Sequence, residues 1–273
     1  MGFKCGIVGL PNVGKSTLFN ALTASKNAEA ANFPFCTIDP NIGIVDVVDK
    51  RLDKLSELSK SKKKIYTNIT FVDIAGLVKG ASKGEGLGNK FLSHIREVDA
   101  IIHLVRCFES DKITHVNAEI NPINDLETIK TEIVLADIDI IQKKLEKGKK
   151  KLLEPKEITL LENSLKSLNE EKEILTQSDK EEKFLNSLGL LSIKPKIIVC
   201  NVDDSDLIQG NKLTDMMKTR YSNDKIVIIC ADIEDQIMGL DKEERETFMK
   251  EIGLNKTGLN QLIKEGYDLL NLD

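Results

Sequence analysis

Short apolar runs alternate along this chain with longer stretches in which apolar residues recur every three or four positions. Several of the runs are nearly unbroken sequences of Ile and Val, which is typical of strands buried on both faces. The runs predict strands at residues 3–8, 42–48, 67–73, 100–106, 196–201 and 225–230. Because helical stretches separate these strands, the pattern predicts an α/β fold with a doubly wound, mostly parallel sheet.

The stretch at 125–187 interrupts this alternation. It contains no strand pattern, and half of the residues in 142–183 are charged. A turn is expected at Glu154-Pro155, because proline disfavours helix at the preceding residue. We predict an antiparallel, coiled-coil-like helical hairpin inserted between two parts of one α/β domain, 1–124 and 188–273. Its apolar face would comprise Ile138, Ile141, Leu145, Leu152, Ile158, Leu161, Leu165, Leu168 and Leu175.

Composition narrows the range of partners. The net charge of −5 argues against binding nucleic acid over the whole surface, and we expect no DNA specificity, although a local basic patch is compatible with it. Nowhere do about eighteen apolar residues follow one another, as a membrane-spanning helix requires.

Four cysteines lie in or beside strand runs and are expected in the core: Cys5, Cys107, Cys200 and Cys230. Because the chain has no close-spaced cysteine pairs, we expect the reducing cytoplasm as its compartment. We also expect a monomer.

A phosphate-binding motif follows the first strand. Gly-Leu-Pro-Asn-Val-Gly-Lys-Ser at 9–16 fits G-x-x-x-x-G-K-[ST] between a strand and a helix. Its glycines let the backbone wrap a phosphate, and the helix N-terminus favours an anion. Lys15 would approach the β- and γ-phosphates, and the Ser16 hydroxyl would bind Mg²⁺. The predicted contacts are Asn12, Val13, Gly14, Lys15, Ser16 and Thr17.

Two further segments complete the triphosphate site. Asp73-Ile74-Ala75-Gly76 ends the third strand, so Asp73 would face the ligand crevice and hold Mg²⁺ through water. The Gly76 N–H would meet a γ-phosphate. Thr37, in the loop before the second strand, is the candidate for a second hydroxyl ligand of Mg²⁺.

The ends of the last two strands are the predicted base-binding region. Asn201-Val202-Asp203-Asp204 matches N-K-x-D with Val202 in place of Lys. At Cys230-Ala231-Asp232 a backbone N–H can contact the edge of a base. This order of motifs is that of the Ras-like branch of P-loop NTPases, so we expect a G domain rather than a kinase or an AAA-type machine.

With these motifs in view, the chain resembles the YchF subfamily of the Obg GTPases, also called the Obg-like ATPases, over essentially its whole length. The runs at 31–40 and 73–88 are specific to that family. The other residues that carry the resemblance are 1–20, 105–109, 241–245 and 258–272.

The resemblance implies a G domain, the helical hairpin and a C-terminal TGS domain, and the chain stops where that third domain would begin. It also implies a ribosome or RNA partner, with the hairpin and the groove beside it as the docking surface. A basic cluster lies near the hairpin tip and comprises Lys143-Lys144 and the run Lys-Gly-Lys-Lys-Lys at 147–151. It would contact RNA or form a solvated helix face.

The family resemblance and the chemistry of the base-binding residues favour different nucleotides. The acid of N-K-x-D accepts from guanine donors that adenine lacks. Family members usually carry Glu at this position and prefer or accept ATP, whereas this chain has the shorter Asp204. Chemistry favours GTP weakly and the resemblance favours ATP more strongly, so we expect ATP, with GTP also bound.

The chain lacks the glutamine that commonly orients the attacking water. Ras-like enzymes use a Gln directly after D-x-x-G, where this chain has Leu77. The resemblance suggests His115 for this role, with Asn12 helping to hold K⁺; His115 as a solvated loop residue is the alternative. Two other readings are a nucleotide-binding scaffold with negligible hydrolysis and, more weakly, a metabolic P-loop kinase.

Overall fold

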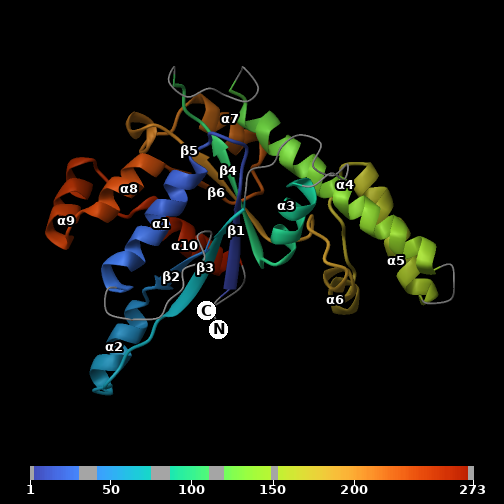
Figure 1. Ribbon diagram of the computed structural model, residues 1–273, viewed down its shortest axis with the longest axis horizontal. Coiled ribbons are helices and arrows are strands. Elements are labelled where there is room, and N and C mark those ends of the chain that lie inside the picture. Colours follow the sequence, from blue (N-terminus) through green and yellow to red (C-terminus); the bar gives the residue numbers. More distant parts are fainter. Residues whose placement is uncertain (1–2, 31–41, 75–86, 111–119, 149–152, 270–273) are drawn as a thin grey trace.

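The computed structural model describes residues 3–30, 42–74, 87–110, 120–148 and 153–269. Within these residues the chain forms one six-stranded sheet in the order β2-β3-β1-β4-β5-β6 (Figure 1). All neighbouring strands are parallel except β2 and β3, which are antiparallel. The strands are β1 (Phe3–Val8), β2 (Ile42–Val47), β3 (Thr67–Asp73), β4 (Ala100–Arg106), β5 (Lys196–Asn201) and β6 (Ile226–Ile229).

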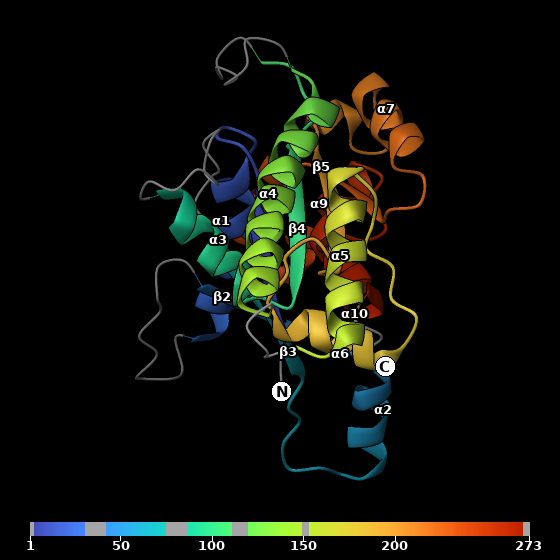
Figure 2. The same ribbon diagram turned by 90° about the vertical axis from the view of Figure 1, so that its right-hand side faces the viewer.

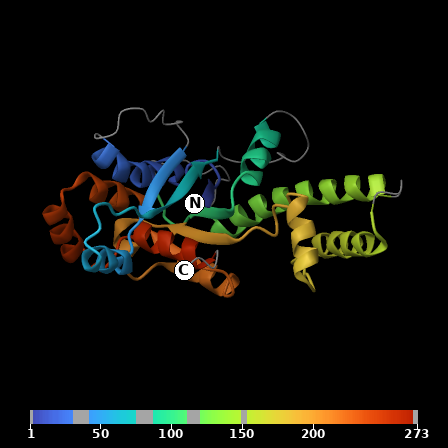
Figure 3. The same ribbon diagram turned by 90° about the horizontal axis from the view of Figure 1, so that it is seen from below.

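Helices cover both faces of the sheet. In Figure 3, α1 lies on one side of it and α10 on the other. On the first side α1 packs against β2, β3 and α8, and on the second α10 packs against β5 and β6. The helices of this part are α1 (Lys15–Ala30), α2 (Lys50–Leu58), α3 (Leu87–Arg96), α7 (Lys212–Arg220), α8 (Ala231–Gly239), α9 (Lys242–Glu251) and α10 (Gly258–Leu269).

A pair of long helices extends from the sheet, α4 (Pro122–Gly148) and α5 (Pro155–Asn169). They run side by side away from the strands (Figure 3). Pro155 opens α5, and Glu154 and Glu157 form a reciprocal capping box there. The pair buries its own apolar cluster, which includes Ile141, Leu161 and Leu168, and the shorter helix α6 (Asp179–Ser187) contributes Leu185 to it. The division of the chain at 125–187 remains a prediction, and α4 itself begins at Pro122.

Asp137 attaches this helix pair to the segment that re-enters the sheet. Its carboxylate on α4 is fully buried and accepts backbone N–H bonds from Leu191 at 2.9 Å and Ser192 at 2.7 Å. Burial raises the pKa of Asp137 above its ordinary value, although these hydrogen bonds oppose the shift. The carboxylate therefore fixes the base of the helix pair against residues that lead directly into β5.

The structure confirms the strand predictions closely. The two outermost strands end earlier than expected: β2 stops at Val47, and β6 spans only Ile226–Ile229. Cys5, Cys107, Cys200 and Cys230 are buried free thiols, as predicted. Leu175 was wrongly assigned to the apolar face of the helix pair: it lies between α5 and α6 and is 82% exposed. No described helix combines the length and the apolar character needed to cross a bilayer.

Candidate functional site

The loop between β1 and α1 has the geometry of a phosphate cradle. β1 ends at Val8 and α1 begins at Lys15, so the loop lies at the carboxyl edge of the central strand. Asn12 and Gly14 have φ angles of +64° and +90°, which turn the backbone sharply before the helix. The first N–H groups of a helix have no partner within it, so the start of α1 favours an anion.

Lys15 and Asp73 meet at this loop. Asp73 ends β3, which pairs with β1 so that Ile7 and Asp73 are register partners. The Lys15 ammonium forms an ion pair with the Asp73 carboxylate, and the two side chains are only 12% and 18% exposed. An ammonium has three donors, so Lys15 can bind a phosphate oxygen at this position as well. The predicted catalytic lysine and the predicted magnesium residue therefore lie in direct contact.

Ser16 is the other described residue predicted to bind Mg²⁺. It is exposed in the first turn of α1, directly after Lys15. A hydroxyl and a carboxylate are hard oxygen donors of the kind that Mg²⁺ prefers, and Mg²⁺ usually takes only one or two protein ligands beside phosphates and waters. Ser16 and Asp73 thus fit the predicted metal.

Asn201 joins the phosphate loop to the base-binding region. Its amide is 4% exposed at the end of β5. The Nδ2 group donates to the Val13 carbonyl at 3.0 Å, and Oδ1 accepts from the Ala231 N–H at 2.9 Å. One side chain thereby ties the loop after β1 to the start of α8. Asn201 therefore holds these segments together, and its predicted role in reading a base stays a prediction.

The other predicted base contacts divide into buried and exposed residues. The side chains of Val202, Cys230 and Ala231 are buried, so these residues can contact a nucleotide only through their backbones. Val202 packs in an apolar cluster with Cys200, and its contact with a nucleotide stays a prediction. Asp204 and Asp232 are exposed and remain available.

Carboxylates gather at this end of the site. The pKa of Asp203 is raised, first by burial and then by the charges of Asp204, Asp206 and Asp232. Asp204 begins a short 3-10 helix, Asp204–Asp206, and its Oδ1 accepts from the Ser205 N–H at 2.7 Å. One oxygen of the carboxylate predicted to read the base is therefore already engaged by its own backbone.

Arg106 is a charged residue that the sequence analysis did not single out. It ends β4 beside Asn201 and is fully buried. Its Nε donates to the Phe108 carbonyl at 3.1 Å, and the guanidinium lies 4.6 Å from the centre of the Phe108 ring. It also opposes the rise in the Asp203 pKa. An arginine at the end of a strand that is apolar except for His103 was the signal that could have identified it.

Four residues named for the site lie outside the described part of the chain: Thr37, Gly76, Leu77 and His115. Leu152 of the predicted apolar face and residues 149–151 of the predicted basic stretch also lie outside it. Their predicted roles stay predictions.

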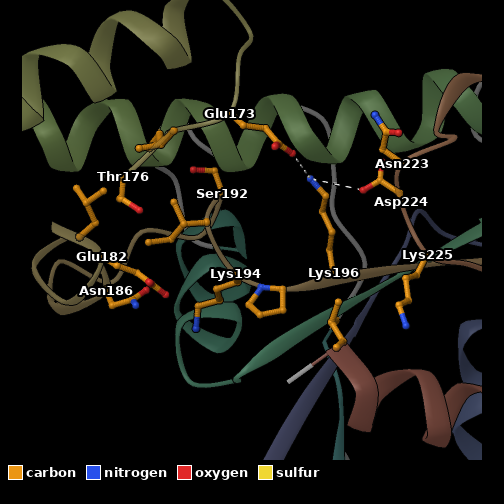
Figure 4. Close-up of a pocket in the computed structure, with 15 residues that line it drawn as sticks. Glu173, Thr176, Glu182, Asn186, Ser192, Lys194, Lys196, Asn223, Asp224 and Lys225 are labelled. Atoms are coloured by element: carbon orange, nitrogen blue, oxygen red, sulfur yellow. Dashed lines mark hydrogen bonds and ion pairs between the residues drawn. The ribbon is translucent and has the colours of Figure 1, made fainter. Parts of the chain in front are cut away.

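A cavity of about 370 Å³ lies away from the phosphate loop, at the amino ends of β5 and β6 (Figure 4). Lys196 points across it toward Glu173 and Asp224, at 3.4 and 3.8 Å. Lys194 donates to the Arg96 carbonyl. Lysines already paired in this way leave little capacity for an anion. The cavity is a seam between the segment after α5 and the sheet, not a nucleotide site.

Comparison with known proteins places the chain among nucleotide-binding proteins. Residues 4–137 match a family described as 50S ribosome-binding GTPase. The whole chain is 49% identical to the ribosome-binding ATPase YchF of Escherichia coli O157:H7 and 46% identical to that of Bacillus subtilis, covering 77% of each relative. The solved structure of the Schizosaccharomyces pombe YchF GTPase matches 99% of the chain and 76% of its own, with a TM-score of 0.85 and 37% identity.

Proposed function

This chain belongs to the YchF family of P-loop nucleotide-binding proteins, and from that membership we propose that it hydrolyses ATP as a nucleotide-dependent switch acting with the ribosome. The observation that carries the proposal is the phosphate loop, with Lys15 held against Asp73 at the carboxyl edge of β1 and β3. We include the ribosome in the proposal because the relatives are named ribosome-binding ATPases. GTP is proposed as a second, weaker ligand.

Binding of the triphosphate would use the main chain of the loop and one side chain. The N–H groups between Asn12 and Ser16 would donate to phosphate oxygens. Lys15 would exchange part of its contact with Asp73 for the β- and γ-phosphates. Asn201 would keep the loop in register with Ala231 while the base is bound.

Mg²⁺ would be held by Ser16, Thr37 and, through water, Asp73. Bound there, it would supply neutralisation of charge between the β- and γ-phosphates. The Lys15 ammonium and the Gly76 N–H would stabilise the charge that develops as water attacks the γ-phosphate in line. Asn12, exposed on the loop, is the candidate ligand for K⁺.

Base selection is the first prediction. In calorimetric titrations with Mg²⁺ and K⁺, ATP should bind at least tenfold more tightly than GTP, a difference of about 1.4 kcal/mol. The relatives named as ATPases carry this expectation, and the bond from the Ser205 N–H to the Asp204 Oδ1 competes with guanine for that oxygen. Asp204→Glu should keep the preference for ATP. If GTP bound at least tenfold more tightly than ATP, the protein would be a GTPase and the prediction would be wrong.

The second prediction concerns hydrolysis. Phosphate release from ATP with K⁺ present should be slow but measurable without ribosomes, because Leu77 cannot position water. His115→Ala should abolish it without weakening ATP binding, whereas His94→Ala, at an exposed position on α3, should not. Wild-type turnover that stays absent both with and without ribosomes would instead favour a nucleotide-binding scaffold.

A further inference from the structure

An arm of the protein projects beyond the end of the sheet opposite the phosphate loop. It consists of residues 48–66, which we call the basic arm, and contains α2 between β2 and β3. Figures 1 and 2 show α2 at the lower extreme of the molecule. None of the residues of α2 is buried. The arm therefore contributes little to the core and presents most of its surface to solvent.

The charge of the basic arm is opposite to that of the whole chain. Seven of its residues are Lys or Arg and three are Asp or Glu, in a chain of net charge −5. Two of its acids are engaged within the arm, since Arg51 pairs with Asp49 and Lys64 with Asp53. Five further lysines are exposed and make no ion pair among the described residues: Lys50, Lys54, Lys60, Lys62 and Lys63.

The arm is preorganised around Asp53. Its carboxylate accepts from the Lys64 ammonium at 2.6 Å and from the Tyr66 hydroxyl. Lys64 also lies 4.9 Å from the centre of the Tyr66 ring. The side chain of Asp49 caps the start of α2 by accepting from the Arg51 N–H. These contacts join α2 to the segment before β3, so the lysines of the helix and those of that segment are held in fixed positions relative to one another.

We propose that the basic arm is an RNA-binding surface and that its partner is the phosphate backbone of ribosomal RNA. The inference rests on the proposed association with the ribosome and names the surface that makes the contact. Lysines gain affinity for a polyanion by releasing its counterions, and each contact adds to the salt dependence of binding. Because the rest of the chain is acidic, the field would orient the molecule with the arm toward the RNA.

Exposed apolar residues of the arm offer a competing partner. Leu55 and Leu58 on α2 are 58% and 82% exposed, and Val48 and Ile65 on either side of the helix are each 70% exposed, so they would be the anchors if the arm entered an apolar groove of a protein. We favour RNA because seven basic residues stand against three acidic ones in the arm, and an apolar groove would leave its five unpaired lysines without an opposite charge. The lysines and the leucines can be changed separately, which makes the choice testable.

The experiment measures binding of the whole chain to purified ribosomes by co-sedimentation with a non-hydrolysable ATP analogue, and to a 20-base-pair RNA duplex by fluorescence anisotropy. The arm variant is Lys54→Glu/Lys62→Glu/Lys63→Glu. The charge control is Lys250→Glu/Lys256→Glu/Lys264→Glu, three exposed lysines elsewhere that give the same net charge. The apolar variant is Leu55→Ser/Leu58→Ser. ATP affinity, measured for all of them, reports correct folding.

We expect the arm variant to bind both ribosomes and duplex at least tenfold more weakly than the wild type. Its slope of log K against log salt should be smaller by about three, one for each lysine lost. The control and the apolar variant should bind like the wild type. Wild-type affinity of the arm variant would overturn the inference while leaving the ribosome association intact. Loss of ribosome binding only in the apolar variant would assign the arm to a protein partner. Absence of wild-type binding to ribosomes would instead refute the association itself.

Discussion

Replacing Lys15 by alanine is expected to weaken ATP binding at least about a hundredfold and to reduce hydrolysis by at least the same factor, each a loss of about 2.7 kcal/mol. Two effects add. The variant loses the ammonium that would contact the β- and γ-phosphates. It also leaves the Asp73 carboxylate, now paired with Lys15 and only 18% exposed, without its cation beside an incoming polyanion. Isothermal titration with ATP and steady-state phosphate release measure the two losses.

The second of these effects can be isolated with a double variant. Lys15→Ala/Asp73→Asn should bind ATP at least tenfold more tightly than Lys15→Ala when Mg²⁺ is removed with EDTA, because the repelling carboxylate is gone. Residues in direct contact are those expected to show such coupling. Asp73→Asn alone should retain ATP binding in EDTA but lose the Mg²⁺-dependent part of hydrolysis. Equal affinities of Lys15→Ala and the double variant would show that Asp73 does not face the phosphates.

The sheet was predictable because its strands carry their signal locally. Runs such as Ile197–Cys200 in β5 are buried along their whole length, and burial on both faces requires apolar residues at successive positions. Leu175 shows the limit of the helical pattern: it continues the apolar spacing of α5 beyond Asn169, where that helix ends. The spacing of apolar residues does not show where a helix ends or where no neighbouring helix packs against it.

The site was predictable as a set of motifs but not as a set of contacts. Lys15 and Asp73 were assigned separately, and only the register of β1 with β3 brings them together. The motif assigned Asn201 to the base-binding region, but it did not reveal the hydrogen bonds of Asn201 to backbone groups of Val13 and Ala231, which are 188 and 30 residues distant. Such a link depends on the order of strands in space, which no motif encodes.

Gly14→Ala is expected to lower ATP affinity at least about a hundredfold although it removes no polar group. Gly14 has a φ of +90°, which is strained for any residue with a side chain. A Cβ there would lie 2.2 Å from the Asn201 Nδ2 atom. Either the loop or Asn201 must move, and Asn201 is buried and held at both ends of its amide. The substitution should therefore distort the cradle and break the link to Ala231 together, as titration with ATP would show.

Gly189→Ala separates backbone strain from this steric effect. Gly189 also has a positive φ, +69°, but a Cβ there would meet nothing within 4 Å. Its substitution should cost only the strain of the left-handed conformation, about 1–2 kcal/mol, and should leave ATP affinity unchanged. Thermal unfolding should show a modest fall in Tm for Gly189→Ala and a larger one for Gly14→Ala. If both variants lost the same stability and both bound ATP like the wild type, the contact between Gly14 and Asn201 would have no part in forming the site.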